Sequence, residues 1–258
     1  ANQNAEKEKT EKIRREFTAN VSHELKTPLT TISGYAQMIS NGMAKAEDIK
    51  EFGRKIEKES DRLLTLIDDI INLSNIDEQG SIENPENIDL SLVTEEAICV
   101  LEKAAKERGI QIYYTKIPTL IKGNVTLVSE LVYNLLDNAI KYNKDNGKIT
   151  VFVGESAKGV ELSVKDTGIG IPPEDTERIF ERFYRVDKSH SKKVGGTGLG
   201  LSIVKHGVLY HGGTVRADST QGEGTTFIIT LPVKLDTVCI EKEDTEEVTI
   251  EGMRILLV

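Results

Sequence analysis

A histidine with an acidic neighbour is the first place in this sequence where side-chain types and spacing could support chemistry. His23 is followed directly by Glu24, and Thr27 comes one helical turn later. The apolar positions Val21 and Leu25 belong to another face of the same predicted helix, so His23 should point to solvent. A neutral imidazole can act as a nucleophile, and an adjacent carboxylate can orient or activate it. An ordinary solvent-facing histidine on a charged helix is the alternative.

A second group of polar residues lies on one face of a helix predicted at residues 126–142. Glu130, Asn134, Asn138 and Lys141 follow one another at helical spacing, opposite an apolar stripe. Asparagine is a mediocre helix former, so two of them one turn apart gain nothing for helix stability. Carboxamide oxygens suit a hard cation such as Mg²⁺, and a nearby lysine suits phosphate. A solvated polar face is the alternative.

Two glycine-rich runs follow this helix. Asp166 ends a predicted strand and leads into Gly168 and Gly170, where an aspartate could accept a hydrogen bond from a ligand amine. Residues 195–200 open a helix, whose backbone N–H groups form a ready phosphate site. Neither run matches the P-loop or Rossmann pattern. The polar stretch between them, residues 187–193, has the composition of a mobile lid.

Two long amphipathic segments must position the histidine. Residues 17–39 carry apolar side chains at alternating steps of three and four, and residues 49–76 continue this type of pattern. The loop at residues 41–42 predicts a helical hairpin, in which Pro28 should bend or loosen the turn that holds His23. Because a hairpin cannot cover both stripes alone, we expect a homodimeric four-helix bundle. A monomer that folds the hairpin against the rest of the chain is the alternative.

The chain beyond a polar linker at residues 81–88 has the pattern of an α/β domain, which contains the asparagine face and both glycine runs. The predicted helices cover residues 91–108, 126–142, 174–181 and 199–211, and the predicted strands cover 110–115, 148–153, 160–166, 214–217 and 225–231. The expected fold class is therefore α plus α/β, a helical hairpin followed by an α/β domain.

Composition limits the classes of partner. The 258 residues carry a formal net charge of −9 without a basic block, so we expect no nucleic-acid partner. Cys99 and Cys239 are isolated, which favours a reducing compartment and no disulfide. No apolar run approaches the roughly 18–20 residues that span a bilayer. Because the chain opens with Ala1, we interpret it as a fragment whose upstream sensor or membrane segment is missing.

Residues 10–233 resemble the catalytic core of a two-component sensor histidine kinase: a HisKA-type dimerisation and phosphoacceptor domain, then an ATP-binding domain of the GHKL superfamily. The segments that carry the resemblance are residues 22–28 (H box), 134–139 (N box), 166–170, 196–200 and 222–227 (three G boxes) and 180–185 (F box). The resemblance implies a Bergerat-type α/β sandwich for the ATP-binding domain, with ATP and Mg²⁺ as cofactors.

The resemblance also implies a role for each matching residue of the nucleotide site. Asp166 would hold the adenine amino group, with Tyr142 packing near the base. Lys141 and Arg185 would steady the triphosphate together with the second glycine run. The other positions implied in nucleotide binding are Gly168, Gly170, Gly196, Thr197, Gly198, Leu199, Gly200 and Thr225.

For the reaction, the resemblance implies that His23 attacks the γ-phosphorus of ATP, through Nε2, while Glu24 draws on the other ring nitrogen. Asn138 would bind Mg²⁺ with the help of Asn134. The phosphoryl group would then pass to an aspartate on the receiver domain of a response regulator. Thr27 could position a water that hydrolyses the regulator's acyl phosphate, which would make the protein a phosphatase as well. An ATP-sensing scaffold and a GHKL ATPase without a phosphorylated histidine are the alternatives.

The expected domain division follows from these assignments. The predicted parts are a hairpin dimerisation and phosphotransfer domain (1–80), a linker (81–88), an ATP-binding domain (89–233), and an acidic linker with a candidate start of a receiver domain (234–258). The short apolar run at residues 253–258 resembles the first strand of a receiver domain; a last strand of the ATP-binding sheet is the alternative. We expect a cytoplasmic portion of a bacterial protein whose parent could be anchored in the inner membrane.

Overall fold

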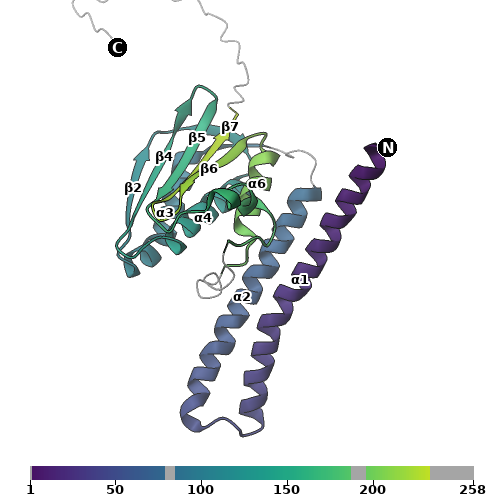
Figure 1. Ribbon diagram of the computed structural model, residues 1–258. Helices are drawn as coiled ribbons and strands as arrows, with labels where there is room; N and C mark the ends of the chain where they lie inside the picture. The colour runs from purple at the N-terminus through teal and green to yellow at the C-terminus, as the bar shows by residue number, and fades with distance from the viewer. Residues whose placement is uncertain (1, 79–84, 187–195, 233–258) are drawn as a thin grey trace, which may run out of the picture.

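Two long helices form the first part of the chain in the computed structural model, which describes residues 2–78, 85–186 and 196–232 (Figure 1). Helix α1 (Asn2–Ser40) and helix α2 (Ala46–Glu78) form an antiparallel hairpin. Gly42 in the connecting loop has a φ of +67°, a conformation that glycine adopts without steric cost. The predicted hairpin is confirmed. Helix α1 continues through Pro28, which is buried.

The hairpin packs through part of its apolar surface and leaves part exposed. The rings of Tyr35 and Phe52 lie 4.9 Å apart between the two helices. Other large apolar side chains face solvent: Leu29, Leu64, Ile67 and Ile71 are 55%, 61%, 38% and 51% exposed. An apolar stripe of this kind on a charged hairpin is the feature from which a four-helix bundle is expected.

The second part of the chain is a mixed sheet with helices on one face (Figure 1). Its five strands, in spatial order, are β2 (Gln111–Lys116), β4 (Lys148–Ser156), β5 (Gly159–Asp166), β7 (Gly224–Leu231) and β6 (Thr214–Thr220). Strands β2 and β4 pair in parallel, and the other neighbours are antiparallel. The helices are α3 (Leu90–Glu107), α4 (Val125–Lys141) and α6 (Gly200–Tyr210). The predicted α/β architecture is confirmed.

Alternating side chains explain why the helices cover one face of this sheet. In β4, Ile149, Val151 and Val153 are fully buried, and the residues between them are not. Helix α4 starts where the side chain of Asn124 accepts a hydrogen bond from the N–H of Leu127 at 3.1 Å. The apolar stripe of α4 then packs into the core between helices and sheet.

Two features differ from the sequence prediction. Residues 86–88 of the expected linker belong to β1 (Glu86–Asp89), which pairs antiparallel with β3 (Leu120–Gly123). The pairing buries Ile88 against Ile121, but four-residue strands are too short to show a clear alternation in sequence.

The helix expected at residues 174–181 is the second difference. This segment consists of two short 3₁₀ turns, η1 (Pro173–Asp175) and η2 (Arg178–Phe180). The buried side chains of Ile179 and Phe180 are adjacent in sequence, so no helical stripe is available to stabilise a longer α-helix.

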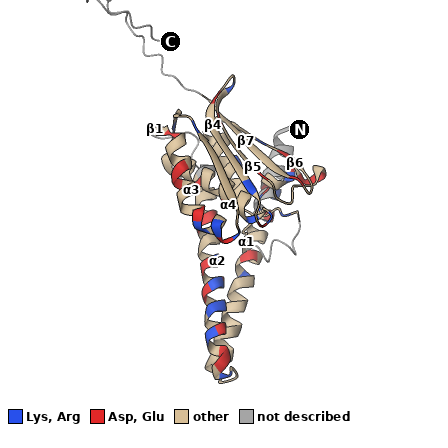
Figure 2. Cartoon of the chain, turned by 90° about the vertical axis from the view of Figure 1, so that its left-hand side faces the viewer, with Lys and Arg blue, Asp and Glu red and all other residues tan. Residues whose placement is uncertain are grey.

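A separate apolar cluster joins the hairpin to the α/β part. Leu66 and Leu73 of α2 pack with Leu199 and Ile203 at the start of α6. Acidic and basic side chains alternate along α2 on the face drawn in Figure 2. None of the described helices is both long and apolar enough to cross a membrane.

Candidate active site

A cavity of about 450 Å³ lies between α4, the end of β5, the start of α6 and one side of α2. The seventeen predicted site residues divide into twelve that line this cavity and five that do not. The predicted positions that line it are Asn134, Asn138, Lys141, Tyr142, Asp166, Gly170, Arg185, Gly196, Thr197, Gly198, Gly200 and Thr225. Gly168 and Leu199 do not line it, and neither does any of His23, Glu24 and Thr27.

The asparagine face of α4 forms one wall of the cavity. The Nδ2 group of Asn134 donates to the carbonyl of Glu130 at 3.0 Å, and that of Asn138 donates to the carbonyl of Asn134 at 2.9 Å. These bonds use the amide N–H₂ groups and leave both Oδ1 atoms as acceptors. Lys141 adds a cation whose Nζ lies 2.6 Å from Asp137 Oδ2. This wall therefore presents neutral carboxamide oxygens, which suit Mg²⁺, and an ammonium group paired with Asp137, which suits phosphate.

Asp166 lines the cavity from the end of β5 and is 6% exposed. Its Oδ1 accepts from the backbone N–H groups of Gly168 at 2.7 Å and Thr225 at 3.2 Å. Burial raises the pKa of this carboxyl, and the two backbone donors oppose that rise. With Oδ1 occupied, Oδ2 is the oxygen that can accept from a ligand amine.

Glycine at position 168 is required by close packing under the cavity. A Cβ there would lie 2.3 Å from the carbonyl oxygen of Tyr142, a backbone atom. Gly168 therefore shapes the site from behind. The ring of Tyr142 lines the cavity, and burial raises the pKa of its hydroxyl.

The second glycine run places backbone groups at the start of α6. A Cβ at position 200 would lie 2.7 Å from Asn134 Oδ1, so glycine allows the helix to begin directly beside the asparagine wall. Arg185 donates to the carbonyl of Gly196. Leu199 is fully buried in the apolar cluster with α2, so its side chain anchors this run. Gly195 and the predicted lid at 187–193 lie outside the described residues.

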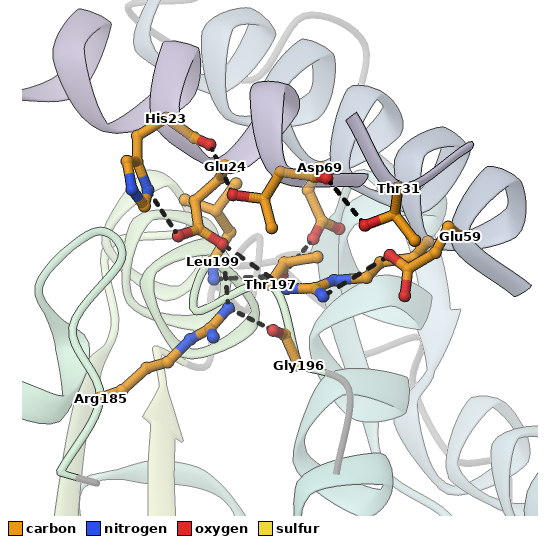
Figure 3. A network of polar contacts seen from close by, with 11 residues as sticks. His23, Glu24, Thr31, Glu59, Asp69, Arg185, Gly196, Thr197 and Leu199 are labelled. Carbon is orange, nitrogen blue, oxygen red and sulfur yellow. Dashed lines mark hydrogen bonds and ion pairs between the residues drawn. The ribbon is translucent and has the colours of Figure 1, made fainter. Parts of the chain in front are cut away.

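His23 lies on α1, outside the cavity, with its side chain 79% exposed. Its Nδ1 is 3.4 Å from Oε1 of Glu24, as the sequence predicted for a carboxylate neighbour (Figure 3). The hydroxyl of Thr27 donates to the carbonyl of His23 at 3.2 Å. The imidazole is therefore accessible, with one ring nitrogen next to a carboxylate and the other directed elsewhere.

Sequence reasoning missed the part of α2 that closes the cavity. Asp69 accepts from the hydroxyl of Thr197 at 2.6 Å, and Asn72 donates to Glu130 Oε1 at 2.7 Å. Burial raises the pKa of the Asp69 and Glu130 carboxyls, against the opposing effect of those hydrogen bonds. A signal was present, because Asp69 shares a helical face with Leu66 and Leu73.

Two family matches cover the two parts of the chain. Residues 13–79 match the family described as the His Kinase A (phospho-acceptor) domain. Residues 123–235 match the family described as histidine kinase-, DNA gyrase B-, and HSP90-like ATPase.

The similarity to known relatives extends over most of the chain. Sensor histidine kinase WalK of Bacillus subtilis (strain 168) is 39% identical over 235 residues, which cover 89% of this chain and 38% of WalK. Sensor-like histidine kinase SenX3 of Mycobacterium tuberculosis (strain ATCC 25618 / H37Rv) is 37% identical over 228 residues, 88% of this chain and 55% of SenX3. The chain thus spans about half or less of these relatives.

Solved structures agree with the fold. The histidine kinase ThkA in complex with the response regulator protein TrrA superposes with a TM-score of 0.66 at 25% identity, over 88% of this chain and 66% of ThkA. Full-length ShkA in complex with AMPPNP gives a TM-score of 0.61 at 29% identity, over 84% of this chain and 45% of ShkA. The phosphoacceptor-type hairpin and the ATPase-type domain define the class, and the chain belongs to the two-component sensor histidine kinases, as their catalytic core.

Proposed function

We propose that the protein is an ATP-dependent histidine autokinase that phosphorylates His23 and then transfers the phosphoryl group to an aspartate of a response regulator. The observation that carries the proposal is the cavity, which has an amine acceptor at Asp166 and an asparagine and lysine wall facing it. A nucleotide site needs both kinds of group, a hydrogen-bond acceptor for the base and cation- and phosphate-binding side chains for the phosphates. The ShkA complex with AMPPNP supports ATP as the ligand.

Within this proposal the cavity residues bind and orient ATP. Asp166 Oδ2 accepts from the adenine amino group, and Tyr142 packs beside the base. Lys141, Arg185 and the second glycine run hold the phosphates. Asn138 and Asn134 would hold Mg²⁺, which neutralises phosphate charge when it is bound.

The acceptor step needs the exposed imidazole. Glu24 faces Nδ1, so the neutral ring keeps its proton there and presents the lone pair of Nε2. Nε2 forms a bond to the γ-phosphorus while the bond to the leaving oxygen of ADP breaks. In the arrangement described, α2 closes the cavity while His23 lies outside it, so the α/β part must move relative to a hairpin before transfer.

The whole protein's partners are part of the proposal. The exposed apolar stripe of the hairpin supports a homodimeric four-helix bundle. The ThkA complex with TrrA supports a response-regulator receiver domain as the phosphoryl acceptor. We propose the parts 1–80, 81–85, 86–233 and 234–258, which moves residues 86–88 of the expected linker into the ATP-binding part because they belong to β1. We also propose a cytoplasmic location beneath a membrane-anchored sensor.

Incubation with γ-labelled ATP tests the proposal. We expect acid-labile, base-stable label on the wild-type protein and none on His23→Gln, while both bind nucleotide equally by calorimetry. Free labelled phosphate without labelled protein would identify an ATPase, and neither product would identify a scaffold. Label that survives His23→Gln would overturn the assignment of the acceptor.

A further inference from the structure

Glu24 is held by more than its histidine neighbour. Its Oε2 lies 3.6 Å from Nη2 of Arg62 on α2 and 3.6 Å from Nη2 of Arg185 in the α/β part. Figure 3 shows Glu24 between His23 and Arg185. One carboxylate therefore has an imidazole at one oxygen and two guanidinium groups at the other.

The contact between His23 and Glu24 does not follow from the helix alone. Adjacent residues on an α-helix point about 100° apart, so their side chains do not naturally face each other. A glutamate also has three rotatable bonds and loses rotamer freedom when it is held in one place. An anchor on Oε2 is needed to keep Oε1 near Nδ1.

The two arginines differ in how long they can serve as that anchor. Arg185 belongs to the α/β part, so its contact with Glu24 is lost when that part moves to deliver ATP. Arg62 and Glu24 lie on the same hairpin, and their side chains are 22% and 24% exposed. Their contact can persist through the movement.

Arg62 is itself held in place. Its Nη1 lies 3.8 Å from Oε2 of Glu59, one turn earlier on α2. The guanidinium thus bridges two carboxylates from two helices, which suits its planar, forked set of donors. The bridge fixes the orientation of Glu24 from the side opposite His23.

We propose that Arg62 is a positioning residue for phosphorylation of His23, because it holds the Glu24 carboxylate against Nδ1. The inference rests on the proposed role of His23 as acceptor. In the neutral ring, the Nδ1 proton then points to Glu24 and the Nε2 lone pair is free. When Nε2 bonds to the γ-phosphorus and ADP leaves, the ring becomes cationic, and the Nδ1–H group faces the carboxylate that balances its charge.

Kinetics of Arg62→Gln give the first test, with Arg54→Gln as a matched control on the exposed side of the same helix. We expect the maximal autophosphorylation rate of Arg62→Gln to fall about tenfold with an unchanged KM for ATP, since positioning of a reacting group is worth roughly 10²-fold or less here. Arg54→Gln should match the wild type. Adding Arg62→Gln to Glu24→Gln should lower the autophosphorylation rate little further, because either change alone already removes the Arg62–Glu24 contact.

The tautomer of His23 gives a readout that a merely structural arginine would not change. In ¹⁵N-labelled protein, the neutral imidazole should shift from the Nδ1–H towards the Nε2–H tautomer in Arg62→Gln, but not in Arg54→Gln. Arg62→Lys, which keeps the charge, should restore part of the wild-type signal.

Equal autophosphorylation rates for Arg62→Gln and Arg54→Gln would overturn the inference. So would a rate loss from Arg62→Gln that is as large in the Glu24→Gln protein as in the protein with Glu24. An unchanged tautomer of His23 in Arg62→Gln would overturn it as well. Absence of label on the wild-type protein would instead overturn the proposed function. The two failures are therefore distinguishable. If Arg62→Gln unfolds, the double-mutant comparison is made with Arg62→Lys, whose ammonium lacks the forked geometry.

Discussion

At the scale of single residues, Asp166 combines a structural and a binding role in one carboxylate. Oδ1 accepts hydrogen bonds from the backbone N–H groups of Gly168 and Thr225, while the buried charge destabilises the nucleotide-free protein. The folded-state pKa is raised above the unfolded value, so the folded protein binds the proton more tightly. The stability that the bound proton contributes is complete below the unfolded-state pKa, and it is lost as pH rises from that pKa through the folded-state pKa.

This conflict predicts opposite effects of Asp166→Asn on stability and binding. The nucleotide-free variant should melt at a higher temperature than the wild type at neutral pH, because a buried charge is removed. Its ATP affinity should fall by roughly 10- to 100-fold, since a hydrogen bond to a charged group is worth about 1.5–3 kcal/mol. Calorimetric titration and thermal unfolding measure both quantities. Unchanged affinity would contradict the placement of the adenine at Asp166.

Thr27 allows a separation of the two activities expected at His23. Thr27→Ala removes the exposed hydroxyl and keeps the helix, since that hydroxyl bonds to the carbonyl of His23 within the same turn. We expect autophosphorylation to stay near the wild-type rate and dephosphorylation of the cognate regulator to fall by roughly 10²-fold. Labelled regulator measures the second rate. Equal dephosphorylation by both proteins would contradict a role for Thr27 in positioning water.

At the scale of elements, the long periodic helices and the main strands could be predicted from the sequence because each buries one regular face. The asparagine face of α4 was predictable for the same reason, since its polar positions oppose an apolar stripe. Strands β1 and β3 were not, because four residues carry too little periodic signal. The 3₁₀ turns at residues 173–180 depend on how Ile179 and Phe180 pack into the core. That packing is a tertiary contact, which the local sequence does not encode.

The exposed stripe of α2 predicts a dimer that can be broken by charge. Leu64→Glu together with Ile71→Glu should weaken self-association by at least about 10³-fold, because each apolar side chain contributes roughly 1.5–3 kcal/mol when buried. Light scattering coupled to size exclusion measures the mass across a dilution series. Leu209→Glu is the control, since Leu209 of α6 is equally apolar and 55% exposed but lies outside the hairpin. A dimer that survives the double change would place the interface elsewhere.

At the scale of the whole molecule, the relation between hairpin and α/β part could not be read from the sequence. It depends on contacts between residues far apart in the chain, such as Asp69 with Thr197 and Phe17 with Phe183, whose rings lie 5.8 Å apart. Asp69 and Phe17 lie on amphipathic helices, while Thr197 and Phe183 lie in irregular segments, and none of these local patterns identifies the residue that it will contact. The motifs predicted the contents of the site, and tertiary packing decided which side of α2 faces it.

Asp69 predicts that this docked arrangement responds to pH. Burial raises the pKa of its carboxyl, and Asp68 and Asp137 add to the rise, while the hydrogen bond from Thr197 and the charge of Lys141 oppose it. An undocked, solvated Asp69 would have an ordinary pKa of about 3.9. Docking therefore takes up a proton within the interval from that value to the raised one. Acidification through this interval should favour the docked state, and a rise in pH should release it.

Asp69→Asn keeps a hydrogen-bonding group for Thr197 and removes the buried charge, so it should stabilise docking and make it insensitive to pH. We expect autophosphorylation several-fold slower than in the wild type, since the docked state keeps His23 away from the cavity. Spin labels at Lys58→Cys and Lys205→Cys, with Cys99 and Cys239 replaced by serine, would report the distance between α2 and α6. The distance distribution should narrow in Asp69→Asn and stay at the wild-type width in Asp61→Asn, an exposed aspartate on the same helix. A faster reaction or a broader distribution in Asp69→Asn would show that the carboxylate favours docking through its charge, and that the sign derived from its burial is wrong.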